Sequence, residues 1–186
     1  YDTLLHMGGT GPQLAQRLRK YTSGTFAGIF SQQSNTDINN PLVPATGKMV
    51  VGEEGTGTWC QWCPRGAVFM DMMSTKYDQY WAGIAVHNGD PMANPVYDAG
   101  IGGLVSGYPS ALVDRVSVID PSEVEADFLT RILVAPKALI TNGATWNSTT
   151  RELKVSTSAN FLAAANNNYK LGIVLTEDEV TGTGSN

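Results

Sequence analysis

Two cysteines, Cys60 and Cys63, are the residues in this sequence whose type and spacing could do chemistry. Two residues separate them, and the 186-residue sequence contains no other cysteine. The thiolate of one cysteine can attack a disulfide of another molecule, and the second can then attack the mixed disulfide and release the partner. The spacing therefore predicts thiol–disulfide exchange, with Cys60 as the nucleophile and Cys63 as the resolving thiol.

The residues around the cysteines predict a strand before them and a helix after them. Residues 49–51 are typical of a strand, and Pro64 is favoured in the first turn of a helix. The apolar residues that follow at helical spacing are Val68, Phe69, Met72, Met73, Tyr77 and Tyr80. A helix N-terminus favours a thiolate through its free backbone N–H groups and its dipole. The predicted helix therefore begins where a reactive cysteine would be stabilised.

Further apolar runs complete the expected domain. The elements predicted after this helix are a strand, a short helix, two strands and a final helix, at residues 83–86, 94–104, 111–113, 116–119 and 121–135. Asp120-Pro121 provides an N-cap and a first-turn proline for the final helix. The order βαβ followed by ββα predicts an α/β domain over residues 48–136.

The two flanks of this domain differ in composition. Residues 1–47 are rich in Gly, Thr and Asn, with one helix candidate starting at Gly11-Pro12, and their role is unclear. The last part, residues 137–186, has strand-like runs and turn signals, the strands at 138–141, 152–157 and 169–175 and the turns at 142–143 and 166–168. We expect a β-rich, sandwich-like C-terminal module, which is incomplete if the chain is a fragment of a longer protein.

Two other uses of the cysteine pair stay open, namely a fixed structural disulfide and a metal site. A closed zinc site needs four ligands, and the two histidines, His6 and His87, lack finger-like spacing from the cysteines. The methionines of the following helix are better explained as core residues than as copper ligands. We therefore expect no metal and no dissociable cofactor, the redox-active disulfide Cys60–Cys63 being the group that reacts.

Charge and hydropathy limit the partners. The 12 Lys and Arg against 17 Asp and Glu give a net charge of -5, so we expect no nucleic-acid partner. The apolar runs fall short of the roughly 18 to 20 residues that span a bilayer, which predicts no transmembrane segment. Residues 1–3 lack a signal-peptide or acylation pattern, so any lipid anchor is expected outside this sequence.

The run Trp59-Cys60-Gln61-Trp62-Cys63-Pro64 resembles the active-site motif of the thioredoxin superfamily. Tyr108-Pro109 falls where that superfamily keeps a cis-proline loop that binds the extended partner chain. The resemblance implies a thioredoxin-like fold and a cis peptide bond before Pro109. The partner-binding residues that it implies are Trp59, Gln61, Trp62, Tyr108 and Pro109.

The resemblance also draws attention to three polar residues. Glu54 stands six residues before Cys60, where thioredoxins have a buried acid that assists proton transfer. Histidine is the side chain that ordinarily changes charge near neutral pH, so His87 could tune the thiolate, and Arg65 could add positive charge beside Cys60. Each has a simpler explanation: a solvated acid at the end of a strand, a hydrogen-bonded loop histidine and a solvated first-turn arginine.

Three segments together, residues 53–66, 86–92 and 106–110, resemble the outer-membrane protein twenty-eight family, thioredoxin-like lipoproteins of Gram-negative envelopes. The similarity extends over residues 48–182 and implies a periplasmic or outer-membrane-associated location, where disulfides persist. The function expected is a thiol–disulfide oxidoreductase acting on protein thiols and disulfides. The alternatives are a non-enzymatic outer-membrane-associated binding lipoprotein with a structural disulfide, and a copper- or heme-maturation factor.

Overall fold

The structure is a computed structural model that describes residues 48–166, 168–178 and 180. The described chain forms two compact units, an α/β unit built on residues 49–134 and a hairpin unit built on residues 135–178. The helix candidate at Gly11-Pro12 lies outside the described residues.

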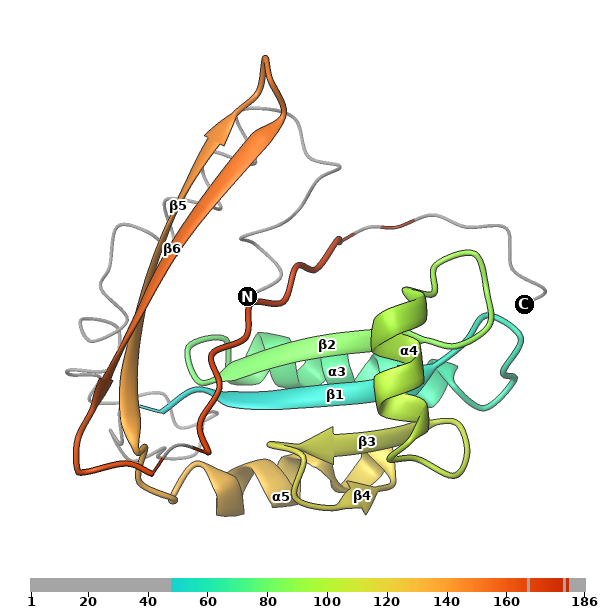
Figure 1. Ribbon diagram of the computed structural model, residues 1–186. Coiled ribbons are helices and arrows are strands. Elements are labelled where there is room, and N and C mark those ends of the chain that lie inside the picture. Colours follow the sequence, from blue (N-terminus) through green and yellow to red (C-terminus); the bar gives the residue numbers. More distant parts are fainter. Residues whose placement is uncertain (1–47, 167, 179, 181–186) are drawn as a thin grey trace. The chain divides into compact units, whose positions relative to one another are not determined.

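The α/β unit is organised around a mixed four-stranded sheet (Figure 1). Its strands are β1 (Val50–Thr56), β2 (Trp81–His87), β3 (Ser110–Val113) and β4 (Val118–Ile119). The sheet order is β2-β1-β3-β4, in which β1 runs parallel to β2 and antiparallel to β3, and β4 runs antiparallel to β3. The predicted α/β class is confirmed, and β1 is a central strand with a neighbour on each side.

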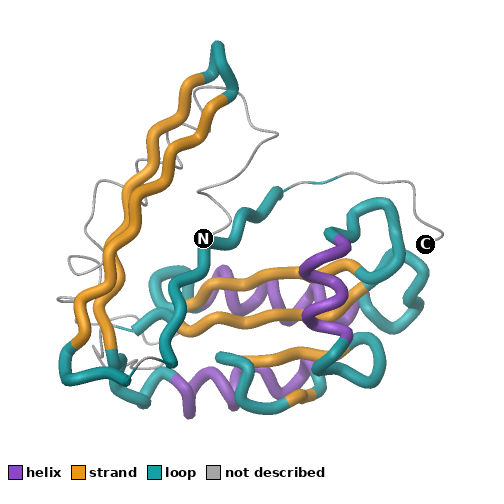
Figure 2. Tube along the Cα trace, in the orientation of Figure 1, coloured by secondary structure: helices purple, strands orange, loops and turns teal. Residues whose placement is uncertain are grey.

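Helices cover both faces of this sheet. They are α3 (Pro64–Lys76), α4 (Pro95–Gly102) and α5 (Val124–Arg131), the last preceded by the short 3-10 helix η2 (Pro121–Glu123). Figure 2 shows α4 on one face of β1 and β2, with α3 behind them on the other. The Asn94 side chain caps α4 by accepting the N–H groups of Val96 and Tyr97, and the Asp120 side chain accepts that of Ser122. The final helix ends at Arg131 and is shorter than predicted.

The apolar core lies between the sheet and the helices α3 and α5. Its buried members are Val50, Met73, Tyr77, Trp81, Ala111, Val113, Val124, Phe128 and Ile132. The ring of Phe128 packs at 4.4 Å from that of Tyr77 and at 5.9 Å from that of Trp81, measured between centroids. The expectation that Val68 belongs to the buried face is wrong, because its side chain is 67% exposed. It lies two residues after the buried Gly66, which puts it on the opposite side of the helix.

Gly52 of β1 lies directly under the indole of Trp81. A Cβ added at Gly52 would lie 1.8 Å from Cη2 of Trp81, whose side chain is buried. We therefore expect Gly52→Ala to lower the free energy of unfolding in urea by about 2 kcal/mol through overpacking. Gly102→Ala in α4 is the matched control, since an added Cβ there has no neighbour within 4 Å. The control should gain about 0.5 to 1 kcal/mol from helix propensity, and an unchanged Gly52→Ala variant would contradict the prediction.

The hairpin unit contains a two-stranded antiparallel sheet of β5 (Ala138–Asn147) and β6 (Glu152–Phe161). The turn expected at residues 142–143 is wrong, because Asn142 and Gly143 pair with Thr157 and Ser156 inside the sheet. The turn instead follows Asn147, whose side chain accepts the N–H groups of Thr149 and Thr150. An Asn side chain that binds nearby backbone amides fixes a turn and therefore the register of the strands.

The expected sandwich is also wrong for the described part of this unit. Residues 169–175, predicted as a strand from their alternating apolar residues, form no strand there. Leu171, Ile173 and Leu175 are between 52% and 63% exposed. Periodicity predicts a strand only where a partner strand can take up its backbone hydrogen bonds, and no described strand pairs with this run.

Candidate disulfide site

Cys60 and Cys63 form a disulfide at the start of α3, with their Cα atoms 5.4 Å apart. Cys63 is the N-cap residue and Pro64 is the first residue of the helix, as the sequence predicted. The N–H of Cys60 donates to the carbonyl of Gly57, and the N–H of Cys63 donates to that of Cys60. The two cysteines are only 4% and 3% exposed. The bond is therefore held in a tight turn at a helix N-terminus, largely shielded from solvent.

A tryptophan directly precedes each of the two cysteines in the sequence. Trp59 is 48% exposed and Trp62 is 66% exposed, and Gln61 between the cysteines is also exposed. The rings of Trp59 and Tyr108 meet edge to face, with their centroids 5.6 Å apart. The peptide bond between Tyr108 and Pro109 is cis, as the resemblance implied. The fold thus brings Trp59 and Tyr108 together from segments that are distant in sequence.

Glu54 is buried beneath the first turn of α3. Its side chain is 1% exposed, and its Oε1 atom has no hydrogen-bond partner in the described chain. A Cβ added at Gly66 of α3 would lie 1.9 Å from this oxygen, so the glycine leaves the room that the carboxyl occupies. Burial raises the pKa of Glu54 to about 7. The simpler explanation, a solvated acid at a strand end, is therefore wrong.

Glu53 is buried as well, on the opposite face of β1. Arg115 donates to both carboxylate oxygens, from Nε at 2.5 Å and from Nη2 at 2.6 Å, and the hydroxyl of Tyr97 in α4 donates to Oε1. Burial by itself would raise the pKa of Glu53, but the hydrogen bonds from Arg115 and Tyr97 outweigh it and hold the pKa below the usual value. Sequence reasoning missed this cluster, since Arg115 follows Glu53 by 62 residues.

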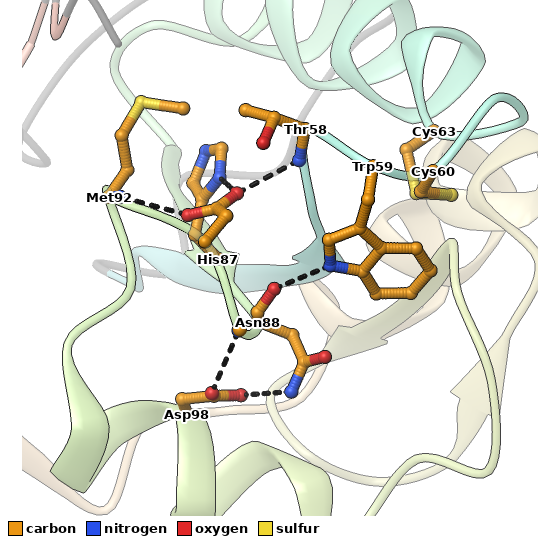
Figure 3. Close-up of polar contacts among 10 residues, drawn as sticks. Thr58, Trp59, Cys60, Cys63, His87, Asn88, Met92 and Asp98 are labelled. Atoms are coloured by element: carbon orange, nitrogen blue, oxygen red, sulfur yellow. Dashed lines mark hydrogen bonds and ion pairs between the residues drawn. A yellow bond between two sulfur atoms is a disulfide. The ribbon is translucent and has the colours of Figure 1, made fainter. Parts of the chain in front are cut away.

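His87 contacts Asp90 (Figure 3). Its Nδ1 lies 2.7 Å from Oδ2 of Asp90, whose carboxylate also accepts the N–H groups of Thr58 and Met92. Burial alone would raise the pKa of Asp90, but the hydrogen bonds from His87 and from the two amides lower it. His87 therefore matches the simpler explanation of a hydrogen-bonded loop histidine. Asp90, which the sequence reasoning did not single out, is the residue that joins these segments.

Arg65 forms an ion pair with Asp120 at the start of η2. Its Nη2 lies 2.5 Å from Oδ2 of Asp120, and the two side chains are 48% and 37% exposed. Hydrogen bonds from Ser122, and then from Arg65, hold the pKa of Asp120 below its usual value. The guanidinium thus joins the start of α3 to η2, where it is partly solvated as the simpler explanation expected.

Residues 48–166, 168–178 and 180 contain no group of three or more His, Cys, Asp or Glu side chains placed to hold a metal ion. Within the same ranges, no helix has both the length and the apolar character that a membrane span requires.

Comparisons with known proteins add little. No family model matches the chain, and no curated protein matches it. A solved structure with some similarity is HBP35 of Porphyromonas gingivalis, with 22% sequence identity and a TM-score of 0.43. The similarity covers 53% of this chain and 37% of that one, so the chain spans little more than a third of that protein's length. At this TM-score the similarity assigns neither fold nor function.

Proposed function

We propose that this protein is a thiol–disulfide oxidoreductase with a thioredoxin-like fold, acting on protein partners in the bacterial envelope, at the periplasm or the outer membrane. One observation carries the proposal: the Cys60–Cys63 disulfide stands at the N-terminus of α3, and the buried carboxyl of Glu54 lies beneath the same first turn. The βαβ and ββα order of the α/β unit is the order expected for that fold. The envelope location rests on the family resemblance of the sequence.

In the oxidising direction, a thiolate of a partner dithiol attacks Sγ of Cys60. The bond between Cys60 and Cys63 breaks, Cys63 leaves as a thiolate that takes up a proton, and Cys60 remains in a mixed disulfide with the partner. The second partner thiolate then attacks the partner's sulfur and releases the thiolate of Cys60. The partner loses two electrons and forms a disulfide, and the protein gains them as a dithiol. The reverse sequence reduces a partner disulfide.

The surroundings of the disulfide suit these steps. The start of α3 stabilises a thiolate through its dipole and its free N–H groups. Glu54, with a pKa of about 7, populates both protonation states near neutral pH, so it can supply or accept a proton beneath this turn. The exposed rings of Trp59 and Trp62 offer apolar surface to a docking chain, and we assign partner binding to these two residues with Gln61, Tyr108 and Pro109.

The equilibrium of the Cys60–Cys63 pair with glutathione tests the proposal. We expect a reduction potential between about -120 and -270 mV, the span of known exchange catalysts. In the reduced protein, Cys60 should be alkylated faster than Cys63, and Cys60→Ser should abolish exchange with a disulfide-containing peptide. The two alkylation rates can be separated by mass spectrometry of digested samples.

A second function has one observation in its favour. Both cysteines are almost fully buried, which is typical of a structural disulfide rather than of a reactive one. The protein would then be a non-enzymatic, outer-membrane-associated binding lipoprotein in which the fold is a scaffold. A potential below about -300 mV, with slow and unselective alkylation of the two thiols, would replace the oxidoreductase proposal with this one.

A further inference from the structure

The loop between β2 and α4 binds Thr58, which lies two residues before Cys60. The carboxylate of Asp90 in this loop is 2% exposed. Its Oδ2 accepts the N–H of Thr58 at 2.8 Å and lies 2.7 Å from Nδ1 of His87, and its Oδ1 accepts the N–H of Met92 at 2.8 Å (Figure 3). One buried carboxylate therefore joins the end of β2, the loop and the segment that leads to the disulfide.

The same loop also binds Trp59, the residue that follows Thr58. Its indole Nε1 donates to the carbonyl of Asn88 at 2.7 Å, which fixes the ring that packs against Tyr108. A Cβ added at Gly57 would lie 2.7 Å from this Nε1 and 3.2 Å from the carbonyl oxygen of Asn88. The segment before the disulfide is thus shaped to let the indole reach the loop.

The loop is in turn anchored on α4. The side-chain amide of Asn88 donates to Oδ1 of Asp98 at 2.8 Å, and the N–H of Gly89 donates to Oδ2 of the same residue at 3.3 Å. Gly89 has a φ of 58°, which a glycine adopts without strain. Thr58 and Trp59 are therefore tied through the loop to a helix of the fold.

We propose that Asp90 is a positioning residue of the disulfide site, which together with the Asn88 carbonyl fixes Thr58 and Trp59 and thereby sets where Cys60 stands. The inference rests on the proposed function. The hydrogen bond from the N–H of Cys60 to the carbonyl of Gly57 closes a turn around Thr58, so a displacement of Thr58 is passed on to Cys60. Exchange requires the attacking, central and leaving sulfurs to be aligned, and a misplacement of about 1 Å can cost about 100-fold in rate.

The test measures two constants for the reaction of the Cys60–Cys63 disulfide with glutathione, in Asp90→Asn and Asp90→Ala variants. Asp90→Ala leaves two backbone N–H groups without their acceptor, so we expect the reduction rate to fall by about tenfold or more. The equilibrium constant should shift about threefold or more toward the dithiol, because a loosened Cys60 is held less closely to Cys63. Asp90→Asn keeps one acceptor oxygen and should fall between Asp90→Ala and the wild type.

Asp71→Asn is the matched control, because Asp71 is an exposed aspartate of α3, and both of its constants should stay within about twofold of the wild type. If Asp90 only stabilised the fold, its replacement would lower the thermal midpoint of unfolding and leave the equilibrium constant with glutathione unchanged. A folded Asp90→Asn variant with wild-type constants therefore overturns the inference.

If neither Asp90 variant folds, Trp59→Phe decides the matter. It keeps an aromatic ring and removes the hydrogen bond to the Asn88 carbonyl, so unchanged constants with glutathione would overturn the inference. The potential of the wild type tests the proposed function separately. A wild-type potential typical of a structural disulfide would remove the oxidoreductase proposal. The ratios of variant to wild-type constants are measured with glutathione, so they test the positioning role of Asp90 without a protein partner.

Discussion

Glu54→Gln should stabilise the protein by about 3 kcal/mol at pH 8 and change its stability little at pH 4. The pKa of Glu54 is about 7 in the folded protein and 4.5 in the unfolded chain. Between these values the folded state keeps a proton that the unfolded state has lost, so wild-type stability falls as pH rises from about 4.5 to about 7. Above pH 7 the fold must bury a carboxylate with an unpartnered oxygen, and a neutral glutamine removes that cost.

Urea unfolding between pH 4 and pH 9 measures this effect as a difference between two curves. The wild-type and Glu54→Gln stabilities should coincide at the acid end and separate through the window between the two pKa values. Asp71→Asn, an exposed acid of the same unit, should follow the wild type at every pH to within about 0.5 kcal/mol. Parallel wild-type and Glu54→Gln curves would mean that water or a partner satisfies the carboxylate of Glu54.

The sequence predicted those parts of the site that depend on neighbours along the chain. Pro64 after Cys63, followed by apolar residues at helical spacing, placed the disulfide at the start of α3, and the structure confirms this position. The resemblance drew attention to Glu54 as a buried acid, and nothing in the sequence singled out Glu53 beside it. Both are buried, because β1 is a central strand with helices on both faces and adjacent residues of a strand point to opposite sides. The partner of Glu53, Arg115, comes from the turn after β3, which no local pattern reveals.

One turn was predicted at the wrong place, and one residue of the site was overlooked. Asn142-Gly143 is a typical turn signal, but Asn147 binds two amides ahead of it and so sets a longer hairpin. His87 was singled out for its chemistry, whereas its partner Asp90 was not. The bond from Asp90 to the N–H of Met92 spans two residues and is a local turn interaction that sequence could have indicated. The bond from Asp90 to Thr58 spans 32 residues and depends on the fold, so only the structure could show it.

Arg115→Met should lower the free energy of unfolding at pH 7 by about 3 kcal/mol. Arg115 binds both oxygens of Glu53, which is 3% exposed, and its removal leaves a buried carboxylate with Tyr97 as its remaining hydrogen-bond donor. The expected loss lies at the lower end of the range for broken buried pairs because half of the Arg115 side chain is exposed to water. Methionine, like arginine, is unbranched at Cβ, so the φ of 54° at this position should cost both residues about the same.

The dependence of stability on pH should also change sign at this site. In the wild type the pKa of Glu53 is lowered, so its contribution to stability is present above its ordinary value of 4.5 and is lost as pH falls toward the folded pKa. In Arg115→Met, burial is no longer outweighed and raises the pKa, so acidification should relieve part of the loss. The double variant Arg115→Met/Glu53→Gln removes the buried charge and should recover about half of the lost stability at pH 7. If the double variant is no more stable than Arg115→Met, the loss comes from packing of the arginine side chain over Tyr97 rather than from an unpaired carboxylate.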